Sequence, residues 1–113
     1  MHVAAAAGVT KWFFGDTYTI KLTSQLTNGS LGLIEASVLR AVVRSCTPHA
    51  REDEIRYLIS GEPEFLSGEQ TFTAGPGDVV VIPRTVRHRF GDLGVDSVKM
   101  LFLFTPAALV RGG

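Results

Sequence analysis

Two of the three histidines in this chain, His49 and His88, stand where they could take part in chemistry. Each heads a short polar run that leads into a strand-like segment, and Glu54 follows His49 at a spacing of five. Imidazole nitrogens and a carboxylate bind divalent metals when a β-barrel brings them together. His49, Glu54 and His88 are therefore predicted to form a site, but their types do not name a substrate.

Short strand-like segments must position these residues. Runs rich in β-forming residues recur at roughly ten-residue intervals, with no convincing long helix between them. Asn28-Gly29 signals a hairpin, Ser67-Gly68-Glu69 a second turn, and Pro83 should stop the strand before it. About eight or nine strands in a small chain predict a sandwich, jelly roll or barrel. The segments are 17–22, 31–39 continued by 42–43, 55–59, 63–66, 70–73, 79–82, 87–90 and 98–104.

Bulk composition narrows the function classes. A chain of 113 residues predicts one domain, and its formal charge of zero argues against electrostatic binding to nucleic acid. The start lacks the basic and apolar regions of a signal peptide, and no segment approaches the length of a membrane span. The single cysteine, Cys46, excludes an internal disulfide and fits a reducing compartment, so we expect a cytoplasmic protein.

Two motifs make the chain resemble the cupins, a family of double-stranded β-helix barrels of the jelly-roll type. The first motif of that family runs from a His-x-His pair through a Glu to a Gly, and its second half is matched in register. The second motif, Gly, Pro and His, is matched at the family's spacing as well. The resemblance covers about residues 12–106 and implies a single antiparallel jelly-roll domain spanning 1–113. The matching residues are His49, Glu54 and Gly61, then Gly77, Pro83 and His88.

The departures from the family pattern bear on metal binding. Thr47 stands in place of the first histidine of His-x-His, so the family's set of three histidines and one glutamate is cut to His49, Glu54 and His88. The resemblance therefore implies a divalent metal, Fe, Mn, Ni or Zn, that is weakly bound or absent. Other departures are Ala41 and Thr85 in place of glycines and Asp92 in place of an asparagine.

Strand alternation makes Arg56 a further candidate site residue. Side chains alternate between faces in a strand, so Arg56 shares a face with Glu54 and Leu58 if the run stays extended. A buried arginine needs an anion. Three alternatives follow: an ion pair with Glu54, a bound substrate carboxylate or phenolate, or a bulge that turns Arg56 outward. The exposed basic cluster of Arg84, Arg87 and Arg89 is read as a solvated rim.

Aromatic residues suggest the character of the ligand. Five phenylalanines are expected to line the barrel or its sheets and to make an apolar pocket for an aromatic or polyketide-like molecule. Small cupins commonly form homodimers through their N-terminal strands, and the apolar run with Trp12 to Phe14 fits such an interface or the core. Residues 4–7 read as a frayed end or an arm that pairs with a partner. The five are Phe65, Phe72, Phe90, Phe102 and Phe104.

Three hypotheses of function follow, because one fold hosts many chemistries. The first, implied by similarity to quercetinase-like cupins, is a metal-dependent, oxygenase-like enzyme that acts on an aromatic or enolisable substrate. Its ligands would be His49, Glu54 and His88, and Arg56 would hold an oxyanion. The second is a metal-free isomerase, cyclase or epimerase that uses a histidine as base and Glu54 as its acid partner. The third is a ligand-binding or regulatory module with a vestigial site.

Overall fold

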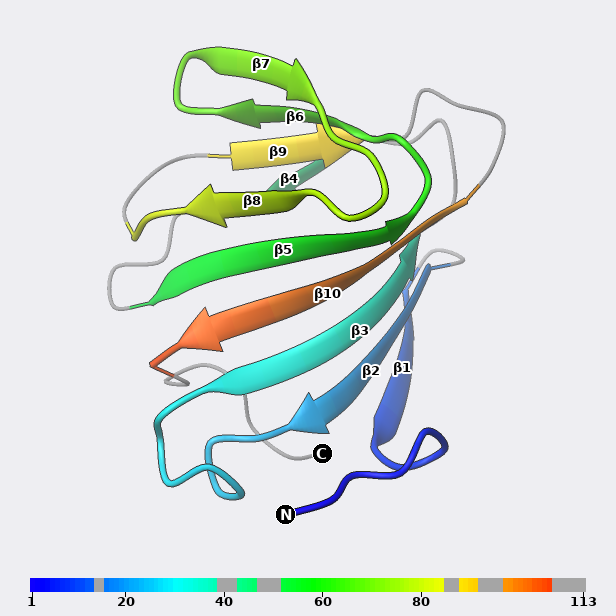
Figure 1. Ribbon diagram of the computed structural model, residues 1–113, viewed down its shortest axis with the longest axis vertical. Helices are drawn as coiled ribbons and strands as arrows, with labels where there is room; N and C mark the ends of the chain where they lie inside the picture. Colours follow the sequence, from blue (N-terminus) through cyan, green and yellow to red (C-terminus); the bar gives the residue numbers. More distant parts are fainter. Residues whose placement is uncertain (14–15, 39–42, 47–51, 85–87, 92–96, 107–113) are drawn as a thin grey trace.

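In the part of the chain that the structure describes, ten strands form two antiparallel sheets (Figure 1). The computed structural model describes residues 1–13, 16–38, 43–46, 52–84, 88–91 and 97–106. Within those ranges no helix has the length and apolar character needed to cross a bilayer. The strands are β1 (Val9–Phe13), β2 (Asp16–Leu22), β3 (Gly32–Val38), β4 (Val43–Cys46), β5 (Asp53–Ser60), β6 (Glu64–Ser67), β7 (Gln70–Thr73), β8 (Val79–Ile82), β9 (His88–Gly91) and β10 (Val98–Thr105).

The strand order is that of a jelly roll. The six-stranded sheet runs β1-β2-β3-β10-β5-β8, and the four-stranded sheet runs β4-β9-β6-β7. The last strand, β10, lies between β3 and β5, so strands far apart in sequence are neighbours (Figure 1). This architecture confirms the all-β, double-stranded β-helix that the sequence predicts.

Most strands lie where the sequence places them, with two differences. The segment from 31 through 43 was expected to be one run, and this is wrong: β3 belongs to the six-stranded sheet and β4 to the four-stranded sheet. The chain changes sheets there, and local β-propensity carries no information about such a crossing. The strand β1 was not expected, and it pairs with β2 along its whole length.

The structure has turns at the glycine, asparagine and proline positions where the sequence predicts them. Gly68, with φ of +61°, and Glu69 join β6 to β7 as a tight hairpin, and β8 ends directly before Pro83. Asn28 and Gly29 both adopt positive φ, and β2 and β3 pair antiparallel around them. That connection is a longer loop, residues 23–31, rather than a two-residue turn.

A phenylalanine-rich core fills the space between the two sheets. Side chains alternate between buried and more exposed along β5 and β10, as expected for strands with one face on a core. The five phenylalanines singled out from the sequence all belong to this core or pack against it, with Phe72 only partly buried. The centroid of the Phe65 ring lies 5.7 Å from that of Phe72 and 5.8 Å from that of Phe90. These ring contacts join β6, β7 and β9 of the four-stranded sheet.

Candidate functional site

Strand β5 directs Glu54 and Arg56 into the space between the sheets. In its register, Glu54 lies opposite Ile82 of β8 and Phe104 of β10, and Arg56 lies opposite Val80 and Phe102. Their exposed fractions are 3% and 1%. The pairing with β8 runs without a register shift over these residues. The shared inward face of Glu54 and Arg56 is confirmed, and the alternative of an outward Arg56 is wrong.

The two charged side chains contact each other directly. Arg56 Nη2 donates a hydrogen bond to Glu54 Oε2 at 3.0 Å, and this contact is a buried ion pair. Removing two charges from water is costly unless they meet each other in good geometry. Of the three alternatives drawn from the sequence, the Glu54–Arg56 ion pair is therefore present. A bound substrate anion stays a prediction.

Aromatic rings enclose the guanidinium. Arg56 Cζ lies 3.7 Å from the centroid of the Phe102 ring and 4.8 Å from that of Phe90. The two rings meet each other nearly edge-on, with centroids 6.3 Å apart. Phe102 comes from β10 of the six-stranded sheet and Phe90 from β9 of the four-stranded sheet. A cation on aromatic faces in a desolvated place is stabilised by the ring quadrupoles, so Arg56 connects the two sheets electrostatically.

A second buried carboxylate lies close in sequence to this pair. Glu52, immediately before β5, is fully buried, and it was not among the predicted site residues. The sequence did contain a signal for Glu52. It lies two residues before Glu54, so in an extended segment it shares a face with Glu54 and Arg56. The run Arg51-Glu52-Asp53-Glu54 looks like a solvated turn because all four residues are charged. The charges by themselves do not indicate which of these side chains face inward. The inner face of this segment thus carries two acids and one base.

The predicted histidine partners are only partly described. His49 and Thr47 lie outside the described residues. His88 is the first residue of β9, where its backbone pairs with Cys46 and Ser67, two positions before the buried Phe90. The convergence of His49, Glu54 and His88 on one point therefore stays a prediction. His2, the third histidine, lines a hollow beside the N-terminal segment and β2.

The described part of the site fits a divalent metal poorly. The predicted ligand Glu54 already neutralises the guanidinium of Arg56 at 3.0 Å. A metal ion bound to the same carboxylate would sit close to that fixed positive charge in a medium where repulsion is strong. Among the residues described, no group of three potential metal-ligating side chains lies together.

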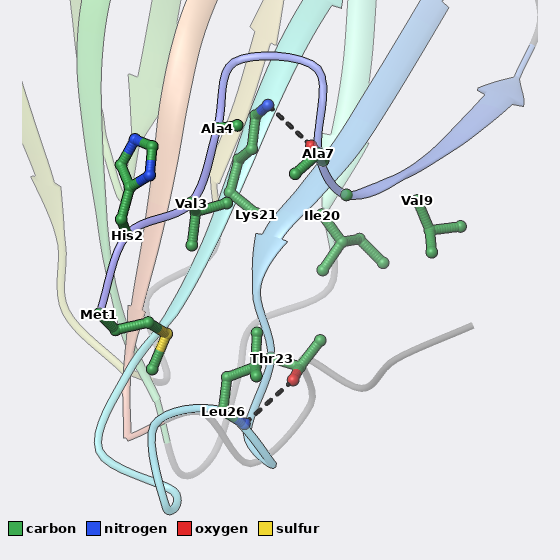
Figure 2. Close-up of a pocket in the computed structure, with 11 residues that line it drawn as sticks. Met1, His2, Val3, Ala4, Ala7, Val9, Ile20, Lys21, Thr23 and Leu26 are labelled. Atoms are coloured by element: carbon green, nitrogen blue, oxygen red, sulfur yellow. Dashed lines mark hydrogen bonds between the residues drawn. The ribbon is translucent and has the colours of Figure 1, made fainter.

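A separate hollow lies at the N-terminal end of the chain. It has a volume of about 540 Å³ and is lined by the N-terminal segment, β2 and the loop after β2 (Figure 2). Met1, Val3 and Ile20 give it an apolar wall, and His2 also lines it. Lys21 Nζ donates to the carbonyl oxygens of Ala5 and Ala7 at 2.6 and 2.9 Å, which holds the segment against β2.

The basic cluster expected at the rim is exposed where it is described. Arg84 and Arg89 are exposed, and Arg87 lies outside the described residues. Arg84 Nε donates to Asp53 Oδ1 at 3.2 Å, and the Arg84 backbone N–H donates to the same oxygen at 2.8 Å. The side-chain hydrogen bond from Arg84 lowers the pKa of Asp53 below its usual value. These contacts agree with the prediction of a solvated rim.

Comparison with known proteins identifies the kind of barrel. A sequence model described as the cupin domain matches residues 42–104. The polyketide synthase CurC of Streptomyces cyaneus is 28% identical over 95 residues, which is 83% of this chain and 61% of CurC. The chain spans 54% and 61% of the length of the two curated relatives that it matches.

Solved structures agree on the fold. KdgF from Halomonas sp. superposes with a TM-score of 0.79 at 22% identity, covering 94% of this chain and 93% of KdgF. A predicted oxalate decarboxylase from Thermotoga maritima superposes with a TM-score of 0.82 at 15% identity, covering 94% and 99%. At such identities the likeness extends to the fold alone.

Proposed function

The chain belongs to the cupin domain family, and we propose that it is an enzyme of acid–base chemistry acting on a small phenolic or enolisable molecule inside the barrel. One observation carries the proposal: a buried Glu54–Arg56 ion pair whose guanidinium lies against the rings of Phe102 and Phe90. Such a cluster offers a fixed cation and aromatic surfaces in one place. Those are the two features that an aromatic oxyanion requires.

Arg56 is proposed to hold the oxygen of the ligand. A guanidinium carries five N–H donors in a planar fork, so an arginine that holds a carboxylate through Nη2 can hold a second oxygen acceptor as well. An enolate or phenolate oxygen gains negative charge as a proton leaves the substrate. A preorganised cation in a dry site stabilises that charge and lowers the barrier to proton transfer.

Glu54 and the histidines divide the remaining roles. Glu54 accepts a hydrogen bond from Arg56, the contact expected of an ionised carboxylate, which favours a role in positioning the guanidinium. His49 or His88 is proposed as the general base that removes the proton. This reaction is an isomerisation, cyclisation or epimerisation, since it needs proton transfer and no redox step.

The same cluster weighs against the metal-dependent alternative. That oxygenase-like reaction requires Glu54 as a ligand for Fe, Mn, Ni or Zn, and the charge of Glu54 is already compensated by Arg56. Similarity to the polyketide synthase CurC supports a polyketide-like aromatic substrate, although the chain spans only part of that relative. A cytoplasmic location, expected from the single cysteine, remains a prediction.

Proton exchange into an aryl ketone tests this function without knowledge of the natural substrate. The probe 4-hydroxyacetophenone has a phenol and slowly exchanging protons next to its carbonyl, so proton NMR in D2O follows exchange directly. The wild type should accelerate exchange. If His49 is the general base, His49→Asn should slow exchange about 100-fold or more, and if His88 is the base, His88→Asn should do so. Arg56→Leu should also lose activity, and Arg84→Leu, which changes an exposed arginine, should retain it.

Three outcomes separate the hypotheses. Exchange that persists in the presence of a chelator supports the metal-free enzyme. Exchange that disappears with the chelator and returns on adding one divalent metal assigns the chemistry to a metal-dependent enzyme instead. Binding of the probe, measured by calorimetry, without any exchange would favour the ligand-binding module.

A further inference from the structure

The hollow beside the N-terminal segment has a polar end and an apolar end. Residues of that segment, of β2 and of the loop after β2 line it, and its volume of about 540 Å³ lies within the usual range of small-molecule sites. We call it the N-terminal hollow. In Figure 2 the Lys21 ammonium lies beside Ala7 at one end, and Leu26 lies at the other. A molecule that fits this arrangement carries a polar group at one end only.

The polar end is a lysine whose described partners carry no charge. Lys21 is half-buried, and its Nζ donates to the carbonyl oxygens of Ala5 and Ala7 at 2.6 and 2.9 Å. A lysine ammonium is charged at neutral pH and has three N–H donors, so these two contacts leave one donor for a ligand. None of the described residues that line the hollow is acidic. A partly desolvated cation with neutral partners favours an anion, and a carboxylate accepts a charge-assisted hydrogen bond from it.

Aliphatic side chains form much of the remaining wall. Met1, Val9 and Leu26 are 85%, 47% and 51% exposed, and all three line the hollow, together with the half-buried Val3 and Ile20. Single exposed apolar residues are common on proteins, but a group of them around one hollow marks a surface that another molecule covers. The apolar part of the ligand is therefore expected to lie against these side chains.

The type of these side chains favours an alkyl chain over an aromatic ring. The described lining contains no phenylalanine, tyrosine or tryptophan. Aromatic ligands gain from contact with other rings, which Phe90 and Phe102 offer inside the barrel. The flexible thioether of Met1 and the branched side chains of the hollow instead fill irregular space around methylene groups.

The backbone at Gly8 allows the N-terminal segment to lie close to β2. Gly8 has a φ of +107°, and an added Cβ would lie 2.5 Å from the carbonyl oxygen of Ile20. The chain can pass at this distance because Gly8 has no side chain. Lys21 then fastens the preceding residues through the carbonyls of Ala5 and Ala7. The two features together hold one wall of the hollow against the other.

We propose that the N-terminal hollow binds an aliphatic monocarboxylic acid. Its carboxylate accepts a hydrogen bond from Lys21 Nζ, and its alkyl chain lies against Ile20 and Leu26. This site does not depend on the proposed function, because that function assigns an aromatic ligand to Arg56 inside the barrel.

Octanoate is the probe for this site, and 1-octanol, which has the same chain length and no charge, is the matched control ligand. Chemical-shift titration should show that the wild type binds octanoate about tenfold or more tightly than 1-octanol, because only the carboxylate forms a charge-assisted hydrogen bond. Lys21→Met should remove this preference, measured as the ratio of the two Kd values, and Lys21→Arg should retain it. Lys99→Met is the control variant, since Lys99 pairs with Glu35 and does not line the hollow.

Leu26→Gln tests the apolar end and should weaken the binding of both probes about fivefold or more. The aryl ketone 4-hydroxyacetophenone, which is directed at the barrel interior, should not displace octanoate. Far-UV circular dichroism verifies that each variant folds. A wild type with no preference for octanoate overturns the proposal, and so does a preference that survives Lys21→Met. Octanoate that 4-hydroxyacetophenone displaces, and whose binding Leu26→Gln leaves unchanged, lies inside the barrel and overturns the proposal as well.

Discussion

Arg56 and Phe102 are direct cross-strand partners in β5 and β10, and the guanidinium carbon lies 3.7 Å from the centroid of the Phe102 ring. This pairing holds a cation on an aromatic face in a place that solvent does not reach. Phe102 therefore contributes to the proposed site as directly as Glu54 does. Its contribution can be measured apart from the ion pair.

Replacing Phe102 with leucine should destabilise the fold by about 2–4 kcal/mol, because the change removes both a buried ring and its contact with the cation. Urea unfolding measures the loss. The matched control is Phe72→Leu, which removes a ring that stacks on Phe65 in the same core. A double-mutant cycle with Arg56→Leu should give a coupling of about 1–2 kcal/mol for Phe102, and additive losses would show that the cation and the ring do not interact.

Arg56→Leu should lower the free energy of unfolding by about 3–5 kcal/mol, since it leaves the Glu54 carboxylate buried without its guanidinium. The double change Glu54→Leu with Arg56→Leu should cost much less, because apolar side chains can replace a buried ion pair with little net loss. Chemical unfolding of the wild type, both single variants and the double variant gives the comparison. A double variant less stable than either single variant would contradict the ion-pair explanation.

The exposed pair of Asp53 and Arg84 should make a pH-dependent contribution. The hydrogen bond from Arg84 lowers the pKa of Asp53 in the folded state. A lowered folded-state pKa means that the stabilisation is present above the ordinary aspartate range, about pH 4, and is lost as the pH falls through the folded-state value. The difference in unfolding midpoint between wild type and Asp53→Asn should therefore be present at neutral pH and vanish in strong acid.

Salt provides the control for that pair, because exposed charges are screened by ions. The neutral-pH difference should shrink in concentrated sodium chloride. A difference that is the same at neutral and strongly acidic pH would mean that Asp53 acts through packing or its backbone contact rather than through charge.

Gly61, which ends the first family motif, should not tolerate alanine. Its φ is +89°, and an added Cβ would lie 2.8 Å from Val98 Cγ2 and 2.9 Å from Val98 Cα. Gly29 has a similar φ of +81° with nothing within 4 Å of an added Cβ. Gly29→Ala should lower the free energy of unfolding by about 1 kcal/mol, from backbone conformation alone. Gly61→Ala should lower it by about 3 kcal/mol or more, because the added Cβ also overlaps with β10. Equal losses of stability in the two variants, measured by thermal unfolding, would show that the overlap with Val98 contributes nothing.

Local patterns in the sequence determined most of the strands, several of the turns and the shared inward face of Glu54 and Arg56. Alternation is a property of a single extended segment, so the face that Arg56 shares with Glu54 follows from their spacing. Pro83 and Gly68 act on their own backbone, and their effects were predictable for the same reason. The two family motifs added the barrel itself, which the cupin match and the structural neighbours confirm.

Only the tertiary structure decided what surrounds Arg56 and which of the described apolar side chains are exposed. Phe102 and Phe90 come from strands distant from β5 in sequence, and their contact with the cation depends on strand order and register. The placement of β3 and β4 in different sheets and the burial of Glu52 depend on the same packing. The exposure of Val79 and Val81 on β8 could not be predicted either, because an apolar residue in a strand has the same local pattern whether another layer covers it or not.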